Sequence, residues 1–483
     1  MAIYLGVDIG TTSAKCLAVD EDGTVIGQAQ RPYPMARPLP EWAEQDPEDY
    51  WRALVSTVNQ CVALCREQGR DASEIASLAM STQGDTLIVT DERGSPLMPA
   101  ISWMDSRGEV EHEELLAQTG RSFWYKEAAT LPDQHSSACS IRWLQKNRKE
   151  LWAQVRRVCY VADYLAVRLC GKHVSDVPSA SWTPFYSPRE RKWSSAMLDL
   201  LGVPRESLAL AVESGELIGE LLPGVAAELG VSTSTRLIAG AFDQAAAACG
   251  AGAGPDGCSV LSCGTAWVLY SVATSPPIDA LEHLPMCCHT KATEWGIVLP
   301  FSGGSAYDWL LGTCGDRPEG SATDSAPLIF IPHLYGEICP GWHSESRGSL
   351  LGLSMSHTFE DVRLALMRGL ACEARRNMEA GEAAGVEVRR VRMVGGAAKS
   401  DIWPQIIADV LDRPIEVSDC AESACYGAAK LAAGALSGKW SDSQPIREVN
   451  PDSAGAKTQA ELFGQYVQFM EALMPLYVGK RKD

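Results

Sequence analysis

The fold is decided by the opening stretch IYLGVDIGTTSAKCLAV, residues 3–19. Its first apolar run ends at Asp8, a turn follows at residues 10–13, and a second apolar run begins at Cys16. A further turn at residues 22–23 leads into a third short run. Three runs separated by two tight turns predict a three-stranded meander, so the chain begins with a sheet rather than a helix.

Helices and strands alternate farther along the chain. Asp46 suits the N-cap of a helix and Pro47 its first turn, and apolar residues then recur at helical spacing. In the second half we expect an alternating series: a helix at residues 359–384, a strand at 390–394, a helix at 403–411, a strand at 415–417, and helices at 424–435 and 457–476. Such alternation predicts α/β lobes with mainly parallel central sheets.

The chain also carries a weak internal repeat. Residues 259–272 repeat the strand, Gly-Thr turn and strand of the opening. At 483 residues the chain is too long for one compact core. We therefore expect two domains, residues 1–236 and 237–483, with a cleft between them.

Charge and patterning exclude some classes of partner. The 61 acidic and 42 basic side chains give a formal net charge of −19, which would repel a nucleic-acid backbone or an anionic membrane surface. The opening has no basic segment ahead of an apolar one, and no apolar run approaches the roughly twenty residues of a membrane-spanning helix. We therefore expect a cytoplasmic protein that binds neither nucleic acid nor membrane.

Cysteine is abundant, with 16 residues scattered through apolar segments. Because no export signal is visible, we interpret them as buried thiols rather than disulfides. Cys287, Cys288 and His289 are adjacent, but no second pair of ligands stands at zinc-finger spacing. We therefore expect no metal site at this cluster.

The first turn has the residues of a phosphate site. Backbone N–H groups around Gly10 can point at a phosphate, the hydroxyls of Thr11 and Thr12 add donors, and Lys15 adds a positive charge. Asp8 is suited to bind Mg²⁺, through water. A single turn of this kind is commonly just a hairpin, so the interpretation depends on a second one.

That second turn lies in the other half of the chain, at Gly264 and Thr265. Two such hairpins facing each other can bind a polyphosphate from both sides. A third glycine turn runs from Gly395 through Gly396 and Ala397 to Ser400, and its small residues would let adenine and ribose approach the backbone. No Walker A sequence is present, so a P-loop is a poor interpretation.

Seven segments in this order resemble the FGGY family of carbohydrate kinases. The resemblance extends from Tyr4 to about Ala435. The segments are DIGTTSAK (8–15), EWAEQDPEDYW (41–51), WMDSR (103–107), DYLAVRLCGKHVSD (163–176), AFDQAAAACGAG (241–252), LSCGTAW (261–267) and MVGGAAKSD (393–401).

The resemblance implies two ribonuclease H-like domains of the actin-like ATPase superfamily, with ATP and Mg²⁺ in the cleft between them. It implies that Asp243 is the catalytic base, although sequence alone would favour a simple N-cap there. A carboxylate at this place can take the proton of an acceptor hydroxyl. The implied ATP and metal residues are those of the three turns: Asp8, Gly10, Thr11, Thr12, Lys15, Gly264, Thr265, Gly395, Gly396, Ala397 and Ser400.

Acceptor binding is expected mainly from the first domain. Trp103 would pack against the C–H face of a sugar, while Asp105 and Arg107 would hydrogen-bond its hydroxyls; a surface ion pair is the alternative for Arg107. Gln83 and Asp85 align with a segment that reads GQMHG in xylulokinases, and Asp85 stands in place of its histidine. Gln244, next to the implied base, would also contact the acceptor.

The acceptor itself stays open between two classes. We expect a small neutral sugar, first a ketopentose such as D-xylulose, because excess carboxylates disfavour an acidic acceptor such as gluconate. The alternative is a polyol kinase of the erythritol or glycerol type, which the aspartate at residue 85 favours. A non-catalytic, sugar-sensing ATPase of the same superfamily is a third class, and the resemblance alone suggests a homodimer.

Overall fold

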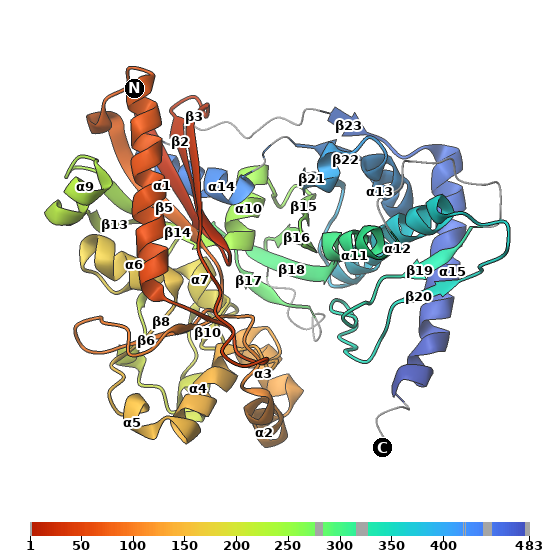
Figure 1. Ribbon diagram of the computed structural model, residues 1–483, viewed down its shortest axis with the longest axis horizontal. Helices are drawn as coiled ribbons and strands as arrows, with labels where there is room; N and C mark the ends of the chain where they lie inside the picture. Colours follow the sequence, from red (N-terminus) through yellow and green to blue (C-terminus); the bar gives the residue numbers. More distant parts are fainter. Residues whose placement is uncertain are drawn as a thin grey trace.

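The computed structural model describes residues 2–275, 284–314, 327–418, 420, 422–437 and 447–478. These residues form two lobes, each built on a central sheet (Figure 1). The first sheet contains β1 (Ile3–Ile9), β2 (Ser13–Asp20), β3 (Val25–Pro32), β5 (Ile75–Thr82), β13 (Leu217–Glu220) and β14 (Arg236–Phe242). The second sheet contains β15 (Cys258–Cys263), β16 (Ala266–Ala273), β17 (Met286–Cys288), β18 (Trp295–Ser302), β21 (Arg390–Gly395), β22 (Ile415–Val417) and β23 (Arg447–Val449).

Helices cover the faces of both sheets. Those that frame the two lobes are α1 (Pro47–Glu67), α6 (Val161–Cys170), α9 (Pro223–Leu229), α10 (Asp243–Ala251), α11 (Gly304–Cys314), α12 (Phe359–Ala383), α13 (Trp403–Leu411), α14 (Ser423–Ser437) and α15 (Ser453–Val478). Smaller helices of the first lobe are α2 (Glu109–Thr119), α3 (Arg121–Ala128), α4 (Ser137–Asn147), α5 (Lys149–Trp152), α7 (Val177–Ser181) and α8 (Ser195–Leu201). Short strands pair outside the main sheets: β4 (Glu44–Gln45) with β7 (Ala100–Ile101), β6 (Ile88–Thr90) with β8 (Arg157–Cys159), β9 (Val174–Asp176) with β12 (Leu210–Val212), β10 (Tyr186–Ser187) with β11 (Lys192–Trp193), and β19 (Ile329–Ile331) with β20 (Ser349–Leu351).

The opening meander is confirmed, because β1 pairs antiparallel with β2 and β2 antiparallel with β3. The predicted start of α1 is confirmed too: the Asp46 carboxylate accepts a hydrogen bond from the Glu48 amide, and Pro47 opens the helix. The expected helix at residues 403–411 and strand at 415–417 have the predicted bounds.

The prediction of mainly parallel sheets is wrong, since both sheets are mixed. In the first sheet only β1–β5 and β5–β14 are parallel, and in the second only β15–β21 and β21–β22. A Gly-Thr turn reverses the chain at the start of each sheet, so the strands on either side of the turn run antiparallel. Alternation of strands and helices by itself indicates parallel strands, whereas each hairpin adds antiparallel pairs to its sheet.

The internal repeat is confirmed by the topology. The first sheet contains the order β14-β5-β1-β2-β3, and the second contains the order β22-β21-β15-β16-β18. Each half therefore starts with three antiparallel strands, crosses over through a long helix, α1 or α12, and adds parallel strands beside the first one. The first strand of each meander lies at the centre of this common order.

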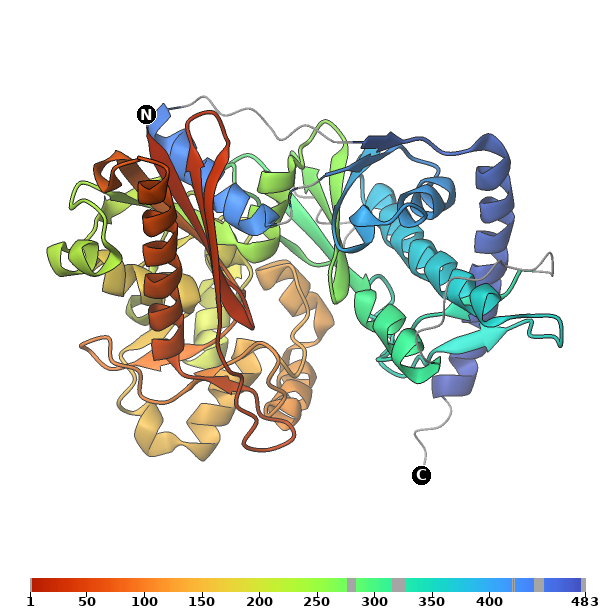
Figure 2. The same ribbon diagram turned by 45° about the horizontal axis from the view of Figure 1, so that its top comes forward.

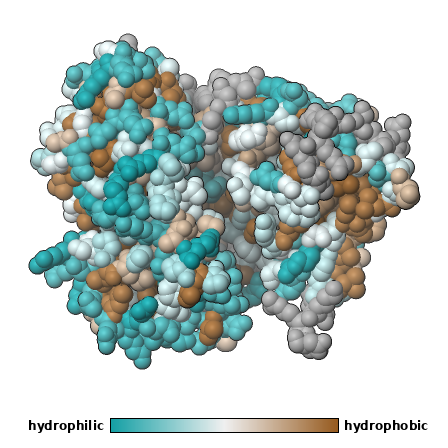
Figure 3. Space-filling view, viewed as in Figure 1, coloured by the Kyte–Doolittle hydropathy of each residue, from teal (hydrophilic) through white to brown (hydrophobic). Residues whose placement is uncertain are grey.

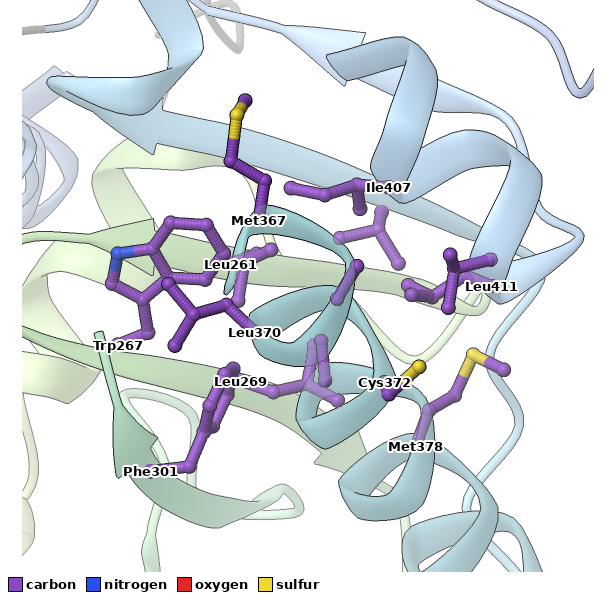
Figure 4. Packing of buried hydrophobic residues seen from close by; sticks show 14 of the residues in the cluster. Leu261, Trp267, Leu269, Phe301, Met367, Leu370, Cys372, Met378, Ile407 and Leu411 are labelled. Atoms are coloured by element: carbon purple, nitrogen blue, oxygen red, sulfur yellow. The ribbon is translucent and has the colours of Figure 1, made fainter. Parts of the chain in front are cut away.

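Helix α12 buries its apolar face against the second sheet. Figure 4 shows Leu370 and Met367 of this helix beside Leu261, Trp267 and Leu269 of the strands. Burying side chains of this size contributes about 1.5–3 kcal/mol each. This packing fixes the strands whose ends carry the second Gly-Thr turn.

Two helices link the lobes at their junction. Helix α10 follows β14 and packs against α14, while α14 lies on β1, β5 and β14 of the first sheet although it comes from the end of the chain (Figure 2). Arg236, at the predicted domain boundary, is the first residue of β14. The division at residues 236/237 stays a proposal. Among the helices that the structure describes, none combines the length and the apolar character needed to cross a bilayer.

Candidate active site

The carboxyl ends of three parallel strands meet at one edge of the first sheet. Ile9 of β1 and Phe242 of β14 both stand opposite Thr82 of β5. Asp8 precedes the end of β1, and Asp243 follows the end of β14 directly. The two predicted carboxylates therefore flank the same strand, and the surface is hollowed where the two lobes meet (Figure 3).

Asp243 has the properties of a general base. Its Oδ1 atom is buried and has no hydrogen-bond partner among the described residues. Burial and, second, the negative charge of Asp8 raise the pKa of Asp243 to about 7, against hydrogen bonds from Gln244 that lower it. A carboxylate with a pKa near the working pH exchanges a proton most effectively.

Asp8 is suited to a hard cation. Burial raises the pKa of Asp8 to about 6, although the Ser81 hydroxyl donates to its Oδ1 at 2.7 Å and Lys15 attracts its negative charge. The carboxylates of Asp8 and Asp243 lie at the same edge of the sheet, and Mg²⁺ would offset their negative charge. Carboxylate oxygens are also the ligands that Mg²⁺ prefers. Lys15 itself is shared, because its Nζ lies 2.6 Å from Glu422 Oε2 just before α14.

The first Gly-Thr turn is fixed by hydrogen bonds from several segments. The Gly10 amide donates to Ser13 O at 3.1 Å, and the Thr11 carbonyl accepts from Gln45 Nε2 at 2.8 Å. Trp103 Nε1 donates to the Thr11 hydroxyl at 2.9 Å. The Thr11 hydroxyl hydrogen thus remains for another acceptor, and the neighbouring Thr12 is exposed.

The second Gly-Thr turn is anchored to a helix start. The carbonyls of Gly264 and Thr265 accept from the amides of Gly304 and Ser305, at 3.0 and 2.9 Å, where α11 begins. Gly264 and Thr265 are themselves exposed. Their amide and hydroxyl groups are therefore accessible to a ligand.

The third glycine turn lies beside the second one. Cys263 pairs with Gly395 across β15 and β21, and the Gly396 amide donates to Cys263 O at 3.2 Å. Gly395 has φ 96°, and a Cβ there would lie 2.6 Å from Cys263 O, so a side chain does not fit. Ala397 starts a short 3-10 turn, and the Ser400 hydroxyl accepts from the first amides of α13.

Among Trp103, Asp105 and Arg107 of the WMDSR segment, only Trp103 is exposed. It is 45% exposed, and its indole contacts Thr11. The side chains of Asp105 and Arg107 are 0% and 1% exposed and pair with each other at 2.7 Å. Arg107 also contacts Glu44 at 2.8 Å and lies over the Trp42 ring. In this conformation the ion pair fixes the backbone beneath Trp103 instead of facing a ligand.

Asp85, which stands where the xylulokinase segment has a histidine, is hydrogen-bonded to the first residue of α4. It has φ 51°, and its carboxylate accepts from both the amide, at 2.9 Å, and the hydroxyl of Ser137, the first residue of α4. Burial raises the pKa of Asp85 to about 7. Its neighbour Gln83 is buried, and its side chain contacts Gln45 at 3.4 Å and Thr86 at 3.2 Å. The side chains of Gln83 and Asp85 therefore both form hydrogen bonds within the first lobe.

Two further residues lie near the site, and the sequence pattern does not identify them. Gln45 connects Thr11 to Gln83 and lies inside EWAEQDPEDYW, whose local pattern indicates only the start of a helix. Trp182 stacks on Phe242, with ring centroids 4.6 Å apart and planes 15° apart, directly before Asp243. A Cβ at Gly84 would lie 2.3 Å from the Trp182 ring, so the glycine provides the space for the indole.

Comparison with known proteins covers nearly the whole chain. Residues 3–250 match the N-terminal domain, and residues 302–436 the C-terminal domain, of the FGGY family of carbohydrate kinases. The xylulose kinase of Escherichia coli strain K12 is 29% identical over 443 residues, covering 89% of each chain. The gluconokinase of Bacillus subtilis strain 168 is 26% identical over 448 residues, covering 88% of this chain and 86% of the other.

A solved structure has the same architecture. The crystal structure of a xyloylose kinase from Brucella ovis matches with a TM-score of 0.91 at 28% identity, over 98% of this chain and 100% of that one. The predicted fold, two ribonuclease H-like domains of the actin-like ATPase class with a central cleft, is therefore confirmed.

Proposed function

Because the chain belongs to the FGGY family of carbohydrate kinases, and is a kinase that phosphorylates a sugar, we propose D-xylulose or a similar ketopentose as its acceptor. The xylulose kinase of Escherichia coli, which aligns over most of the chain, supports this choice. The donor implied by the family is ATP. The observation that carries the mechanism is the unpaired, buried Oδ1 of Asp243 at the edge shared with the first Gly-Thr turn.

In the proposed mechanism Asp243 accepts the proton of one acceptor hydroxyl. The freed oxygen bonds to the γ-phosphorus of ATP as the bond from that phosphorus to the β-phosphate bridging oxygen breaks, and ADP leaves. The proton passes from Asp243 to solvent after the product departs. General-base help of this kind contributes roughly 100-fold to 10,000-fold.

The Gly-Thr turns supply donors to the phosphates. Thr11, Thr12 and the amides around Gly10 would contact them from the first lobe, and Gly264 with Thr265 from the second. Asp8 would bind Mg²⁺, which would offset the charge of the terminal phosphates. The open backbone at Gly396 would pack against the adenosine.

The acceptor side favours a neutral ligand. In this proposal the indoles of Trp103, which is partly exposed, and of Trp182, which stacks on Phe242 before Asp243, would pack on the C–H face of a sugar, and Asp243 and Gln244 would hydrogen-bond its hydroxyls. A polyol of the erythritol or glycerol type is the alternative, which the sequence pattern at residue 85 suggests.

Two further properties belong to the proposal. None of the 15 cysteines described with their side chains forms a disulfide, which suits a reducing compartment such as the cytoplasm. The homodimer suggested by family resemblance is tested by light scattering on the purified chain.

ADP release measured across a panel of acceptors tests the assignment. The panel contains ketopentoses, aldoses, polyols, glycerol and gluconate, each with ATP and Mg²⁺. We expect the highest kcat/KM with D-xylulose or another ketopentose. If turnover is highest with a polyol, the polyol alternative holds in place of the ketopentose. If it is highest with gluconate, the preference for a neutral acceptor is wrong. ADP release that does not depend on an acceptor would overturn the proposed acceptor.

A further inference from the structure

A thiol, a carboxylate and an imidazole gather in the first lobe, outside the kinase site. Cys159 ends β8, Asp163 lies in the first turn of α6, and His173 immediately precedes β9. One donor atom from each residue lies within 4.8 Å of the other two. In the part of the chain that the structure describes, this is the one cluster of three such residues that could hold a metal ion. Unlike the neighbours Cys287–His289, these residues are brought together by the fold.

The spacing of the three donors approximates that of a tetrahedral metal site. Cys159 Sγ lies 3.4 Å from His173 Nε2, and His173 Nε2 lies 2.9 Å from Asp163 Oδ2. Zinc–sulfur and zinc–nitrogen bonds of about 2.3 and 2.0–2.1 Å at a tetrahedral angle separate sulfur from nitrogen by about 3.6 Å, and nitrogen from oxygen by about 3.3 Å. Opening the cluster by a few tenths of an ångström would therefore admit the ion.

The surroundings of the cluster orient its donors. The Tyr160 amide donates to Asp163 Oδ1 at 2.7 Å, which leaves Oδ2 directed at His173. Cys159 and Asp163 are each 1% exposed, while the His173 side chain is 16% exposed. The cluster is therefore reached by solvent at the histidine, and fixed outer partners such as the Tyr160 amide improve metal binding.

We propose that Cys159, Asp163 and His173 bind one Zn²⁺ ion, with water as the fourth ligand. On binding, the Cys159 thiol loses its proton to solvent, and the neutral His173 carries its proton on Nδ1 so that Nε2 donates its lone pair. A thiolate and a carboxylate then balance the two positive charges. The ion would link β8, α6 and β9, so the role that we propose for it is structural.

The site has a connection to the acceptor side. Tyr160, between Cys159 and Asp163, contacts the Ser137 hydroxyl at 2.9 Å, and Ser137 binds Asp85. Metal binding would therefore stabilise the segment that orients Asp85, apart from any role of Asp8 in binding Mg²⁺.

The test uses the purified full chain, stripped with a chelator and reloaded with Zn²⁺ or Co²⁺ alone. We expect one tightly bound Zn²⁺ per chain, a rise in Tm on reloading, and a thiolate-to-Co²⁺ charge-transfer band in the near ultraviolet. His173→Gln, which changes a partly exposed side chain, should weaken Zn²⁺ binding at least about tenfold, because losing even an outer partner costs that much. Cys159→Ser should abolish the charge-transfer band.

Cys170→Ser is the matched control. Cys170 is a thiol on α6, the helix that contains Asp163, but it does not belong to the cluster. It should bind Zn²⁺ like the unaltered chain. Absence of stoichiometric metal in the unaltered chain would overturn the proposal. So would metal binding that His173→Gln and Cys159→Ser leave unchanged, since the ion would then lie at another thiol. If Cys159→Ser does not fold, the Zn²⁺ affinity and Tm of His173→Gln decide.

Discussion

The charge of Asp8 acts on Asp243. The two residues stand at the carboxyl ends of β1 and β14, on either side of β5, and after burial the Asp8 carboxylate is the next cause that raises the pKa of Asp243 to about 7. Burial also raises the pKa of Asp8, to about 6. Two carboxylates so placed destabilise the empty protein and suit a site that binds a cation and takes up a proton.

Asp243→Asn should stabilise the ligand-free protein at pH 8. Because the folded-state pKa of about 7 lies above the ordinary 3.8, the contribution of Asp243 to stability is fully present below about pH 4 and is lost progressively as the pH rises to about 7. At about 1.4 kcal/mol per pKa unit, the variant should gain roughly 1–4 kcal/mol at pH 8 and little at pH 4. Urea unfolding at both pH values measures this, and a variant no more stable at pH 8 would contradict it.

The rate should follow the ionisation of the same group. Since Asp243 must be deprotonated to act as a base, log kcat/KM should rise with a slope near one below pH 7 and level off above it. A steady-state profile from pH 5.5 to 9 at saturating Mg²⁺ measures the apparent pKa. A flat profile across pH 7, with chemistry shown to limit the rate, is the contrary result.

Substitutions at Gly395 and Gly396 should have different effects, the first on stability and the second on ATP binding. A Cβ at Gly395 meets Cys263 O at 2.6 Å and φ is 96°, so Gly395→Ala should cost roughly 1–3 kcal/mol of stability. Gly396 has φ −61° and a Cβ there meets nothing within 4 Å, so Gly396→Ala should leave the Tm unchanged. It should nevertheless raise the KM for ATP several-fold if adenosine packs there. Equal effects of the two substitutions on Tm and KM would argue against this division.

Trp103 and Arg107 should affect different quantities. Trp103 is a 45% exposed residue, so in Trp103→Ala the KM for the acceptor should rise roughly tenfold while stability falls by about 1 kcal/mol or less. Arg107→Gln leaves the Asp105 carboxylate buried without its cation and should cost about 3–5 kcal/mol. Unfolding and acceptor saturation curves of both variants measure the contrast; Arg107→Gln acting on KM alone would assign Arg107 to the acceptor.

The parts of the fold that depend on local pattern could be predicted. The cap at Asp46 and Pro47 fixed the start of α1, and apolar spacing gave α13 and β22 their bounds, because such signals act between neighbours in the chain. The meander and the second hairpin were predicted, but the further antiparallel pairs of β13 with β14 and of β22 with β23 were not, because strand direction there depends on segments that are not adjacent in the chain. Both Gly-Thr turns were found because a glycine turn between two apolar runs is itself a local pattern.

The site was harder to predict, for the same reason. Lys15 pairs with Glu422 across 407 positions, and Asp85 binds the start of a helix 52 positions away, so neither partner is visible in the local sequence. Gln45 and Trp182 reach the site only through contacts with distant segments, Gln45 with Thr11 of the first turn and Trp182 with Phe242 of β14. Resemblance supplied Asp243, whose local pattern is that of an ordinary helix start.

The most direct test of the account is the sugar-dependent turnover of Asp243→Asn. Asp176→Asn is a matched control, because burial raises the pKa of Asp176 as well, to about 6, but both of its carboxylate oxygens accept hydrogen bonds from Ser179, unlike the unpaired Oδ1 of Asp243. With the best acceptor, ATP and Mg²⁺, the account predicts that Asp243→Asn loses roughly 100-fold to 10,000-fold in kcat while it still binds ATP, and that Asp176→Asn keeps its kcat. Undiminished kcat in Asp243→Asn would contradict it.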